Sequence, residues 1–413
     1  MTPLFTNDAI VLGILIGILA FVFKTSHSEN PFWKKFYSIV PALLMCYFIP
    51  ALFNSLGIIS GEQSNLYFVS SRFLLPTSLV LLTLSIDLKG ILRLGPKAVI
   101  MFFTATVGIV IGGPLAILIV SFFAPDIVGG AGPDAVWRGL ATVAGAWSGG
   151  SANQTAMKEV FSVSDNLFSA MIAVDVIVAN IWMAFLLFGA GISQRIDAYT
   201  KSDTKAIEEV RKKVEDYRAS IARIPKLTDL IVISAVGFGV TAFAHFGADL
   251  IVPWIERVAP YLDKYSLTSN FFWIVVIATT GGLLLSFTRS RELEGAGAST
   301  VGSLLLYVLI ASIGMKMNIL AIFEDPELFL VGLIWMAVHV ILLLIVGKLI
   351  KAPFFFVAVG SQANVGGAAS APVVASAFHP ALAPVGVLLA VLGYALGTYA
   401  AWLCGILMQA VAP

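Results

Sequence analysis

Long uncharged apolar runs recur from one end of the chain to the other, and they restrict it to one class of fold. Hydrophobic residues make up 59% of the 413 residues and charged residues only 12%, whereas a soluble domain is about 45–50% apolar. Because lipid offers the backbone no water, an apolar run within it must satisfy its own hydrogen bonds as a helix. The chain is therefore predicted to be an all-α polytopic membrane protein embedded in the lipid bilayer.

Runs of about 17–25 uncharged residues are long enough to span a bilayer, and the sequence predicts ten of them, five on each side of a charged segment. This divides the chain into a first membrane repeat at 1–192, a charged linker at 193–226 and a second membrane repeat at 227–413. The ten predicted spans are Ala9–Phe23, Ser38–Ile58, Leu66–Ile86, Ala98–Ala124, Leu167–Ile192, Leu227–Phe246, Phe271–Phe287, Ser299–Met315, Leu328–Val346 and Ala381–Val411.

The linker has mixed charges and the pattern of one amphipathic helix, roughly Lys205 to Ala222, which ends before Pro225. It is predicted to be either a solvated tether or an element with a regulatory or membrane-surface role.

Two glycine-rich segments interrupt the apolar pattern at corresponding places in the two halves. They are GAWSGGSANQTA, within residues 136–160, and VGSQANVGGAAS, within residues 354–378. Non-helical backbone at membrane depth is tolerated only where it is buried in protein or lines a cavity, and transporters use such interruptions to bind substrates. Each segment is predicted to be a re-entrant hairpin or a broken helix that crosses the membrane.

The distribution of Lys and Arg favours hairpins, because basic residues accumulate on the cytoplasmic side. With two hairpins and an external N-terminus, 19 of the 25 basic residues are cytoplasmic, 5 are outside and Arg72 lies within a span. If both segments cross the membrane, at best 14 basic residues are cytoplasmic and 10 are outside. The predicted topology has a cytoplasmic linker and both termini outside, in the bacterial inner (cytoplasmic) membrane.

This topology makes the second half an inverted repeat of the first, since each half has five spans and one interrupted segment in the same order. Local similarity supports the repeat. SLVLLTLSIDLKGIL at Ser78 to Leu92 is similar to SLLLYVLIASIGMKMNIL at Ser303 to Leu320, and SAN at Ser151–Asn153 matches QAN at Gln362–Asn364. The order of the matched segments carries more weight than their letters.

The SGGSAN, SQANVGG and SIDLKGIL segments, in this arrangement, resemble the YjcL-like membrane proteins over nearly the whole chain. That family is placed near the glutamate:sodium symporters, the citrate-type carboxylate transporters and the bile-acid and sodium/proton antiporter families. The resemblance implies an inverted-repeat core, a homodimer and elevator-type movement. It names no substrate.

The two interrupted segments supply the predicted substrate site. Helix ends within a membrane present unpaired amides, which favour anions, or unpaired carbonyls, which favour cations. Arg72 is expected either to clamp a substrate carboxylate or to extend towards the interface. The predicted substrate-binding residues are Ser148, Gly149, Gly150, Ser151, Asn153, Gln154, Ser361, Gln362, Asn364, Gly366, Gly367 and Arg72.

Asp175 is the only charged residue between Leu167 and Ile192, and a carboxylate within a span is usually functional. It is predicted to bind the coupling cation or to take up a proton, together with Asn180, Asn153, Asn364 and Thr398; a structural hydrogen bond is the alternative. The isolated His339 is expected to be a packed histidine, or else part of a proton relay.

Other classes of function fit the sequence less well. Asp175 lacks the second carboxylate of an intramembrane aspartyl hydrolase, and the four histidines and two cysteines show no metal-ligand spacing. A net charge of +1, with the basic residues in loops, gives no nucleic-acid surface. No enzymatic activity, cofactor or transition metal is expected.

The sequence predicts a secondary active transporter that couples Na⁺ or H⁺ to symport of a small organic anion, an amino acid, carboxylate or small acidic peptide, by alternating access. A membrane receptor or a channel without coupled uptake is the alternative.

Overall fold

The computed structural model describes residues 3–37, 40, 42–87, 91–92, 94–202, 224–317, 326–379 and 382–413. Every regular element within these ranges is a helix, and none of them contains a strand. The predicted linker helix at Lys205 to Ala222 and the end of the SLLLYVLIASIGMKMNIL segment lie outside the described residues.

Seven described helices are long and apolar enough to cross a bilayer, or up to nine if two sharply bent pairs each form one span. The bent pairs are α2 (Pro31–Tyr37) with α3 (Ala42–Ser55), at 92°, and α15 (Asn270–Ser286) with η4 (Arg289–Ala296), at 94°. The seven are α1 (Asp8–Ser26), the continuous α4 (Leu66–Val69), η1 (Ser70–Leu74) and α5 (Leu75–Leu84), α7 (Pro96–Phe123), α11 (Asp165–Gly191), α14 (Leu227–Val258), α17 (Leu328–Leu349) and α20 (Ala383–Val411).

The sequence predicts ten spans, whereas the lengths of the described helices support seven, or up to nine with the bent pairs. The tenth predicted span corresponds to α16 (Ala298–Gly314), an apolar helix of only 17 residues. The other short elements are α8 (Pro125–Val128), η2 (Gly132–Asp134), α9 (Val136–Gly149), α10 (Ser151–Val160), α12 (Ser193–Thr200), η3 (Pro260–Tyr265), α18 (Phe354–Val365) and α19 (Gly367–Phe378).

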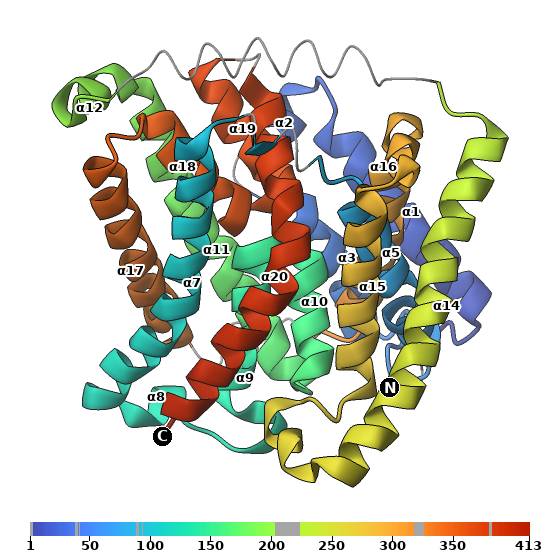
Figure 1. The fold of residues 1–413 in the computed structure, drawn as a ribbon. Coiled ribbons are helices and arrows are strands. Elements are labelled where there is room, and N and C mark those ends of the chain that lie inside the picture. Colours follow the sequence, from blue (N-terminus) through green and yellow to red (C-terminus); the bar gives the residue numbers. More distant parts are fainter. Residues whose placement is uncertain are drawn as a thin grey trace.

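The helices gather into two groups, each built from both halves of the chain (Figure 1). In the first, which we call the scaffold bundle, α5 packs against α14, α15 and α16, and α1 and α3 pack against α16. In the second, the hairpin bundle, α7 packs against α17, α18 and α20, and α20 also packs along α9 and α19. Helix α10 packs against α9, and α11 packs against α9, α17 and α19, so both belong to the hairpin bundle. Contacts of α20 with α5 and α15, and of α10 with α15, join the bundles.

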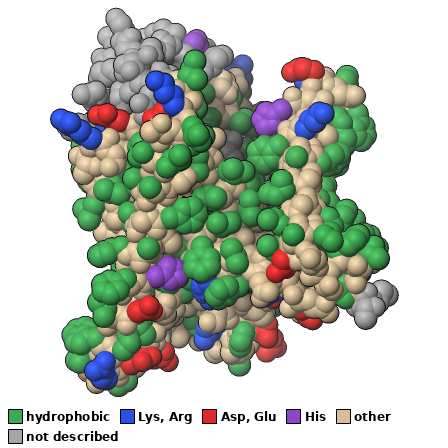
Figure 2. Space-filling view, turned by 90° about the vertical axis from the view of Figure 1, so that its right-hand side faces the viewer, with side chains coloured by type: hydrophobic (Ala, Val, Ile, Leu, Met, Phe, Trp, Pro, Cys, Tyr) green, Lys and Arg blue, Asp and Glu red, His purple; other side chains and the backbone are tan. Residues whose placement is uncertain are grey.

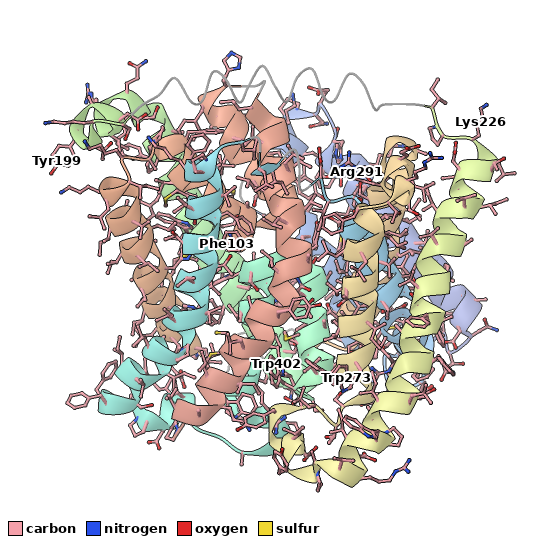
Figure 3. The ribbon with its side chains drawn as sticks, in the orientation of Figure 1. Phe103, Tyr199, Lys226, Trp273, Arg291 and Trp402 are labelled. Carbon is pink, nitrogen blue, oxygen red and sulfur yellow. The ribbon has the colours of Figure 1, made fainter. Side chains whose placement is uncertain are left out.

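The surface is that of an integral membrane protein. Large apolar side chains such as Phe122, Phe188 and Phe243 are exposed, and hydrophobic side chains cover the middle of the face in Figure 2, while charged ones gather at its two ends. Lys226 and Arg291 lie near the upper end in Figure 3. In Figure 1, α12 and the start of α14, which flank the linker, are at the upper end and the C-terminus is at the lower end.

Candidate functional site

The first glycine-rich segment folds back on itself as a helical hairpin. Helix α9 ends at Gly149 and α10 begins at Ser151; Gly150 between them has a φ of +80°, which suits glycine. At the open end, Arg138 donates a hydrogen bond to the Phe161 carbonyl, and the rings of Trp137 and Phe161 are 5.5 Å apart. The two limbs approach closely because Gly145 faces the backbone of α10; a Cβ there would lie 2.6 Å from the Asn153 carbonyl oxygen.

The second glycine-rich segment forms another hairpin. It turns at Gly366 and at Gly367, whose φ is +58°. At its open end, the rings of Phe354 and Phe355 lie 6.1 Å and 5.3 Å from that of Phe378. Of the two arrangements that the sequence leaves open, both segments therefore have the hairpin form.

The turn positions correct the sequence match between the hairpins. Asn153 lies three residues after the turn glycine Gly150, whereas Asn364 lies two residues before Gly366. The SAN and QAN triplets are thus on different limbs, and Gly150 corresponds to Gly367 instead. Apolar helices contain so few distinctive residue types that a match of three residues could not determine how the two hairpins align.

The two tips meet, and a cavity of about 360 Å³ opens beside them. A Cβ on Gly367 would lie 3.8 Å from the Cα of Gly150. The hairpin bundle provides most of the lining, and α3 and α16 of the scaffold bundle close the other side. Its polar lining residues in the described part of the chain are Ser151, Asp175, Asn180, Ser303, Tyr307, Gln362, Ser370 and Tyr394.

The Asp175 carboxylate is held between the limbs of the first hairpin. Its Oδ1 accepts a hydrogen bond from Trp147 Nε1 at 2.8 Å, and its Oδ2 accepts one from Gln154 Nε2 at 3.3 Å. Among the described residues that line the cavity, Asp175 is the only carboxylate, and none is Lys, Arg or His. Burial away from such cations makes an uncompensated carboxylate expensive, so a ligand that supplies positive charge is favoured here.

Neutral oxygen atoms line the same cavity as this carboxylate. Gln362 is 1% exposed; its Nε2 donates to Ser370 Oγ at 2.7 Å, and its Oε1 has no hydrogen-bond partner. Asn180 donates from Nδ2 to the Val176 carbonyl at 2.6 Å, which leaves Oδ1 as an acceptor. Carbonyl oxygens of this kind are suitable ligands for a hard cation.

Asn153 and Asn364 do not line the cavity; both are fully buried and fix the hairpins to long helices. Asn153 accepts from Thr398 Oγ1 at 2.7 Å and donates to the Gly393 carbonyl, both on α20. Asn364 accepts from Thr106 Oγ1 at 2.8 Å and donates to the Phe102 carbonyl, both on α7.

Ser361 lies deeper in the protein. Its Oγ accepts a hydrogen bond from Trp182 Nε1 and contacts His339 Nε2, both at 2.8 Å, and His339 Nδ1 is 3.1 Å from the Ala105 carbonyl oxygen. Since that carbonyl can only accept, Nδ1 carries the hydrogen and Nε2 accepts from Ser361. His339 is therefore a packed, fully hydrogen-bonded histidine.

Arg72 also lies outside the cavity lining. Its Nη2 pairs with Glu159 Oε2 at 2.9 Å, and its guanidinium lies 4.5 Å from the centroid of the Phe271 ring. The guanidinium is thus paired with a carboxylate of the protein, and its buried Nη1 has no hydrogen-bond partner.

Some of the predicted site residues line the cavity, and the others lie outside its lining. Ser303, Tyr307 and Tyr394 were not predicted site residues, because a serine or tyrosine in an apolar helix gives no distinctive pattern. The predicted residues that line the cavity are Gly150, Ser151, Asp175, Asn180, Gln362, Gly366 and Gly367; those outside the lining are Ser148, Gly149, Asn153, Gln154, Ser361, Asn364, Arg72 and Thr398.

Comparison with known proteins agrees with the membrane fold. A family model described as "Protein of unknown function (DUF819)" matches residues 13–411. The chain is also similar to the protein named "Uncharacterized membrane protein YjcL" of Bacillus subtilis (strain 168), with 23% identity over 353 residues, which cover 84% of this chain and 85% of that protein.

Proposed function

The chain belongs to the family described as "Protein of unknown function (DUF819)", and from this membership and the cavity we propose that it is a secondary active transporter. The single observation that carries the proposal is the meeting of two helical hairpin tips at one cavity beside a carboxylate. Interrupted helices with their ends directed at a common site are typical of secondary transporters. The proposed activity is cation-coupled symport of a small organic anion, with no enzymatic reaction and no cofactor.

Both hairpins present the N-terminus of a helix to the cavity. Gly150 and Ser151 begin α10, and Gly366 and Gly367 begin α19. The first amides of a helix have no intrahelical acceptor, and the helix dipole adds partial positive charge there. A substrate carboxylate is proposed to bind these amides, and Asp175 with the neighbouring oxygens is proposed to hold Na⁺ or a proton.

The position of the cavity between the bundles suits alternating access. Leu43 and Ser303 lie near the starts of α3 and α16, so the cavity extends from the hairpin tips towards the end of the molecule at which α12 lies. The hairpin bundle is proposed to move against the scaffold bundle as an elevator within a homodimer, which would expose the same residues to the other side. The linker is proposed to be cytoplasmic and both termini external, as the distribution of basic residues favours.

Uptake by proteoliposomes tests this function. A metabolite screen by thermal shift, with and without Na⁺, first identifies compounds that stabilise the protein, because a ligand stabilises the state that it binds. The parent protein is expected to accumulate such a compound under an inward Na⁺ or H⁺ gradient, and Asp175→Asn is expected to abolish the accumulation.

Asp126→Asn, which changes an aspartate outside the cavity, is the matched control and should accumulate substrate like the parent. Binding without gradient-driven accumulation by the parent would instead indicate a receptor or a channel. Accumulation by Asp175→Asn equal to that of the parent would mean that Asp175 is structural.

A further inference from the structure

The charges that surround the cavity limit the charge of its ligand. Each helix N-terminus is equivalent to about half a positive charge and each C-terminus to about half a negative charge, so the starts of α10 and α19 are offset by the ends of α9 and α18 at the same tips. Among the described lining residues no Lys, Arg or His adds positive charge. The negative charge of Asp175 is therefore not balanced in the empty cavity.

A singly charged anion at the hairpin tips would add a second negative charge to that of Asp175. One monovalent cation beside Asp175 offsets one of these two charges and leaves the anion to the helix N-termini, whereas a dianion with the same cation leaves a further negative charge without a partner. Charges that are partly shielded from water interact strongly, so such an imbalance weakens binding considerably.

The lining also contains ligands for a cation beside the anion. Gln362 is nine-tenths buried or more, lines the cavity and has an unpartnered Oε1, which is independent of the helix-end argument. Asn180 retains its Oδ1 as an acceptor, because its Nδ2 is bonded to Val176. Asp175 uses one hydrogen bond on each carboxylate oxygen, so each oxygen keeps a free lone pair.

The remainder of the lining is mostly apolar. Leu43, Val176 and Leu306 form part of it, and Tyr307 and Tyr394 add aromatic surface. Such a wall suits a hydrocarbon body and offers a second carboxylate no ion-pair partner.

We infer that the substrate of the proposed transporter is a small monocarboxylate with an apolar body, which binds only together with one monovalent cation held between it and Asp175. This inference rests on the proposed function and specifies the ligand of the same site. Because the cation neutralises Asp175, removal of that charge removes the need for the cation.

Binding to the purified full-length protein tests the inference. Matched probes are butyrate with succinate and hexanoate with adipate, each pair differing by one carboxylate, and leucine with 4-methylpentanoate, which differ by the ammonium group. Affinities are measured by thermal shift and calorimetry in sodium chloride and in choline chloride at neutral pH. Monocarboxylates are expected to bind at least about 30-fold more tightly in sodium than in choline, the loss typical of removing one partner of a desolvated charge pair.

The decisive variant is Asp175→Asn. It should bind the monocarboxylates in choline about as tightly as the parent does in sodium, a gain that an unfolded or damaged protein cannot show. Asp126→Asn should keep the sodium requirement of the parent.

The inference is overturned if succinate or adipate binds more tightly than its monocarboxylate, or if leucine binds as tightly in choline as in sodium. It is also overturned if no monocarboxylate binds in sodium, or if folded Asp175→Asn still needs sodium. The probe comparisons on the parent remain decisive should Asp175→Asn fail to fold. Sodium-dependent binding of monocarboxylates without uptake by proteoliposomes would refute the proposed transport and leave the inferred monocarboxylate ligand intact. Sodium-driven uptake of succinate would support transport and refute the inferred ligand.

Discussion

At the scale of single residues, the hydrogen bonds around Ser361 form a directional chain. Trp182 donates to Ser361, Ser361 donates to His339, and His339 donates to the carbonyl of Ala105. These residues belong to α11, α18, α17 and α7, so four helices of the hairpin bundle are joined at one point. Each polar side-chain group in this row of hydrogen bonds has a partner, which is why a histidine and a serine can be buried here.

Ser361→Ala should destabilise the protein, because it leaves His339 Nε2 and Trp182 Nε1 without a partner. Each buried polar group left unsatisfied costs about 1–3 kcal/mol, so a clear fall in the melting temperature of the purified protein is expected. The matched control is Ser376→Ala, which removes an exposed hydroxyl bonded only to the Val373 carbonyl of its own helix. Equal melting temperatures for the two variants would contradict this account.

At the scale of elements, α20 is shaped to receive the first hairpin. Gly393 and Gly397 form a G-x-x-x-G motif, which permits close helix packing in membranes. A Cβ on Gly397 would lie 2.4 Å from Asn153 Nδ2 and 2.8 Å from the Cα of Gly149. The motif was a signal in the sequence that the predicted site did not include, and it fixes the hairpin tip beside the cavity.

Gly397→Ala is expected to separate α20 from the first hairpin and so displace the tip. Overpacking of this kind typically costs about 1–3 kcal/mol, and ligand binding at the tips should weaken with it. Gly17→Ala on α1 is the control, since a Cβ there meets nothing within 4 Å and alanine is the better helix former. The melting temperature and ligand affinity of both variants check the prediction, which fails if Gly397→Ala behaves like Gly17→Ala.

A side chain of the short helix α12 binds the start of the second hairpin. Asp197 is 8% exposed, and its Oδ1 accepts the backbone N–H of Phe354 at 2.7 Å. Burial raises the pKa of the Asp197 carboxyl above its ordinary value. A raised pKa means that the folded protein binds this proton more tightly than the unfolded chain does.

The contribution of Asp197 to stability should therefore be complete below its unfolded pKa and be lost as the pH rises through its folded pKa. Asp197→Asn keeps an acceptor for Phe354 without the charge, so its stability relative to the parent should be higher at neutral pH than in acid. Asp197→Ala removes the acceptor and should cost about 1–3 kcal/mol in acid, and less at neutral pH, where the parent has itself lost part of the stabilisation by Asp197. Melting temperatures across the acid range would show it; a constant difference between Asp197→Asn and the parent would refute it.

At the scale of the whole molecule, charged residues join the two bundles at the end away from α12. Tyr67 and Arg72 of the scaffold bundle contact Glu159 at the end of α10. Lys316, which follows α16, is 3.5 Å from Asp165 at the start of α11. The cavity extends towards the opposite end, so these contacts hold the bundles together on the side where it is closed.

Glu159→Gln should weaken this contact and favour exposure of the cavity on that side. The two states are the conformations in which the cavity is open on one side or on the other. Each tenfold change in their ratio corresponds to about 1.4 kcal/mol, so loss of the partly buried Arg72–Glu159 pair should change the ratio several-fold. Labelling of Ser151→Cys by an impermeant thiol reagent, with Cys46 and Cys404 replaced, should increase from the side opposite the linker. Lys34→Gln, which breaks an exposed pair with Glu29, should leave labelling unchanged; the same rate in Glu159→Gln and the parent would contradict the prediction.

The sequence was informative wherever one residue type has one use in a membrane. Glycine at Gly150 and Gly367 marked backbone turns, and Asp175, singled out because few roles justify a carboxylate in a span, lines the cavity. Serine and asparagine were ambiguous, since the same groups bind ligands or join helices. Asn153 and Asn364 were predicted to bind substrate, yet their neighbours are α20 and α7.

The sequence by itself determined that the chain is a helical membrane protein, because uncharged runs of bilayer length have no other stable form in lipid. Only the tertiary structure decided which polar residues face the cavity. Hairpins more than 200 positions apart meet at their tips, and α3 and α16 close the opposite wall. Contacts of such large sequence separation depend on how whole helices pack, and packing is set by the shapes of many side chains together, which no local pattern records.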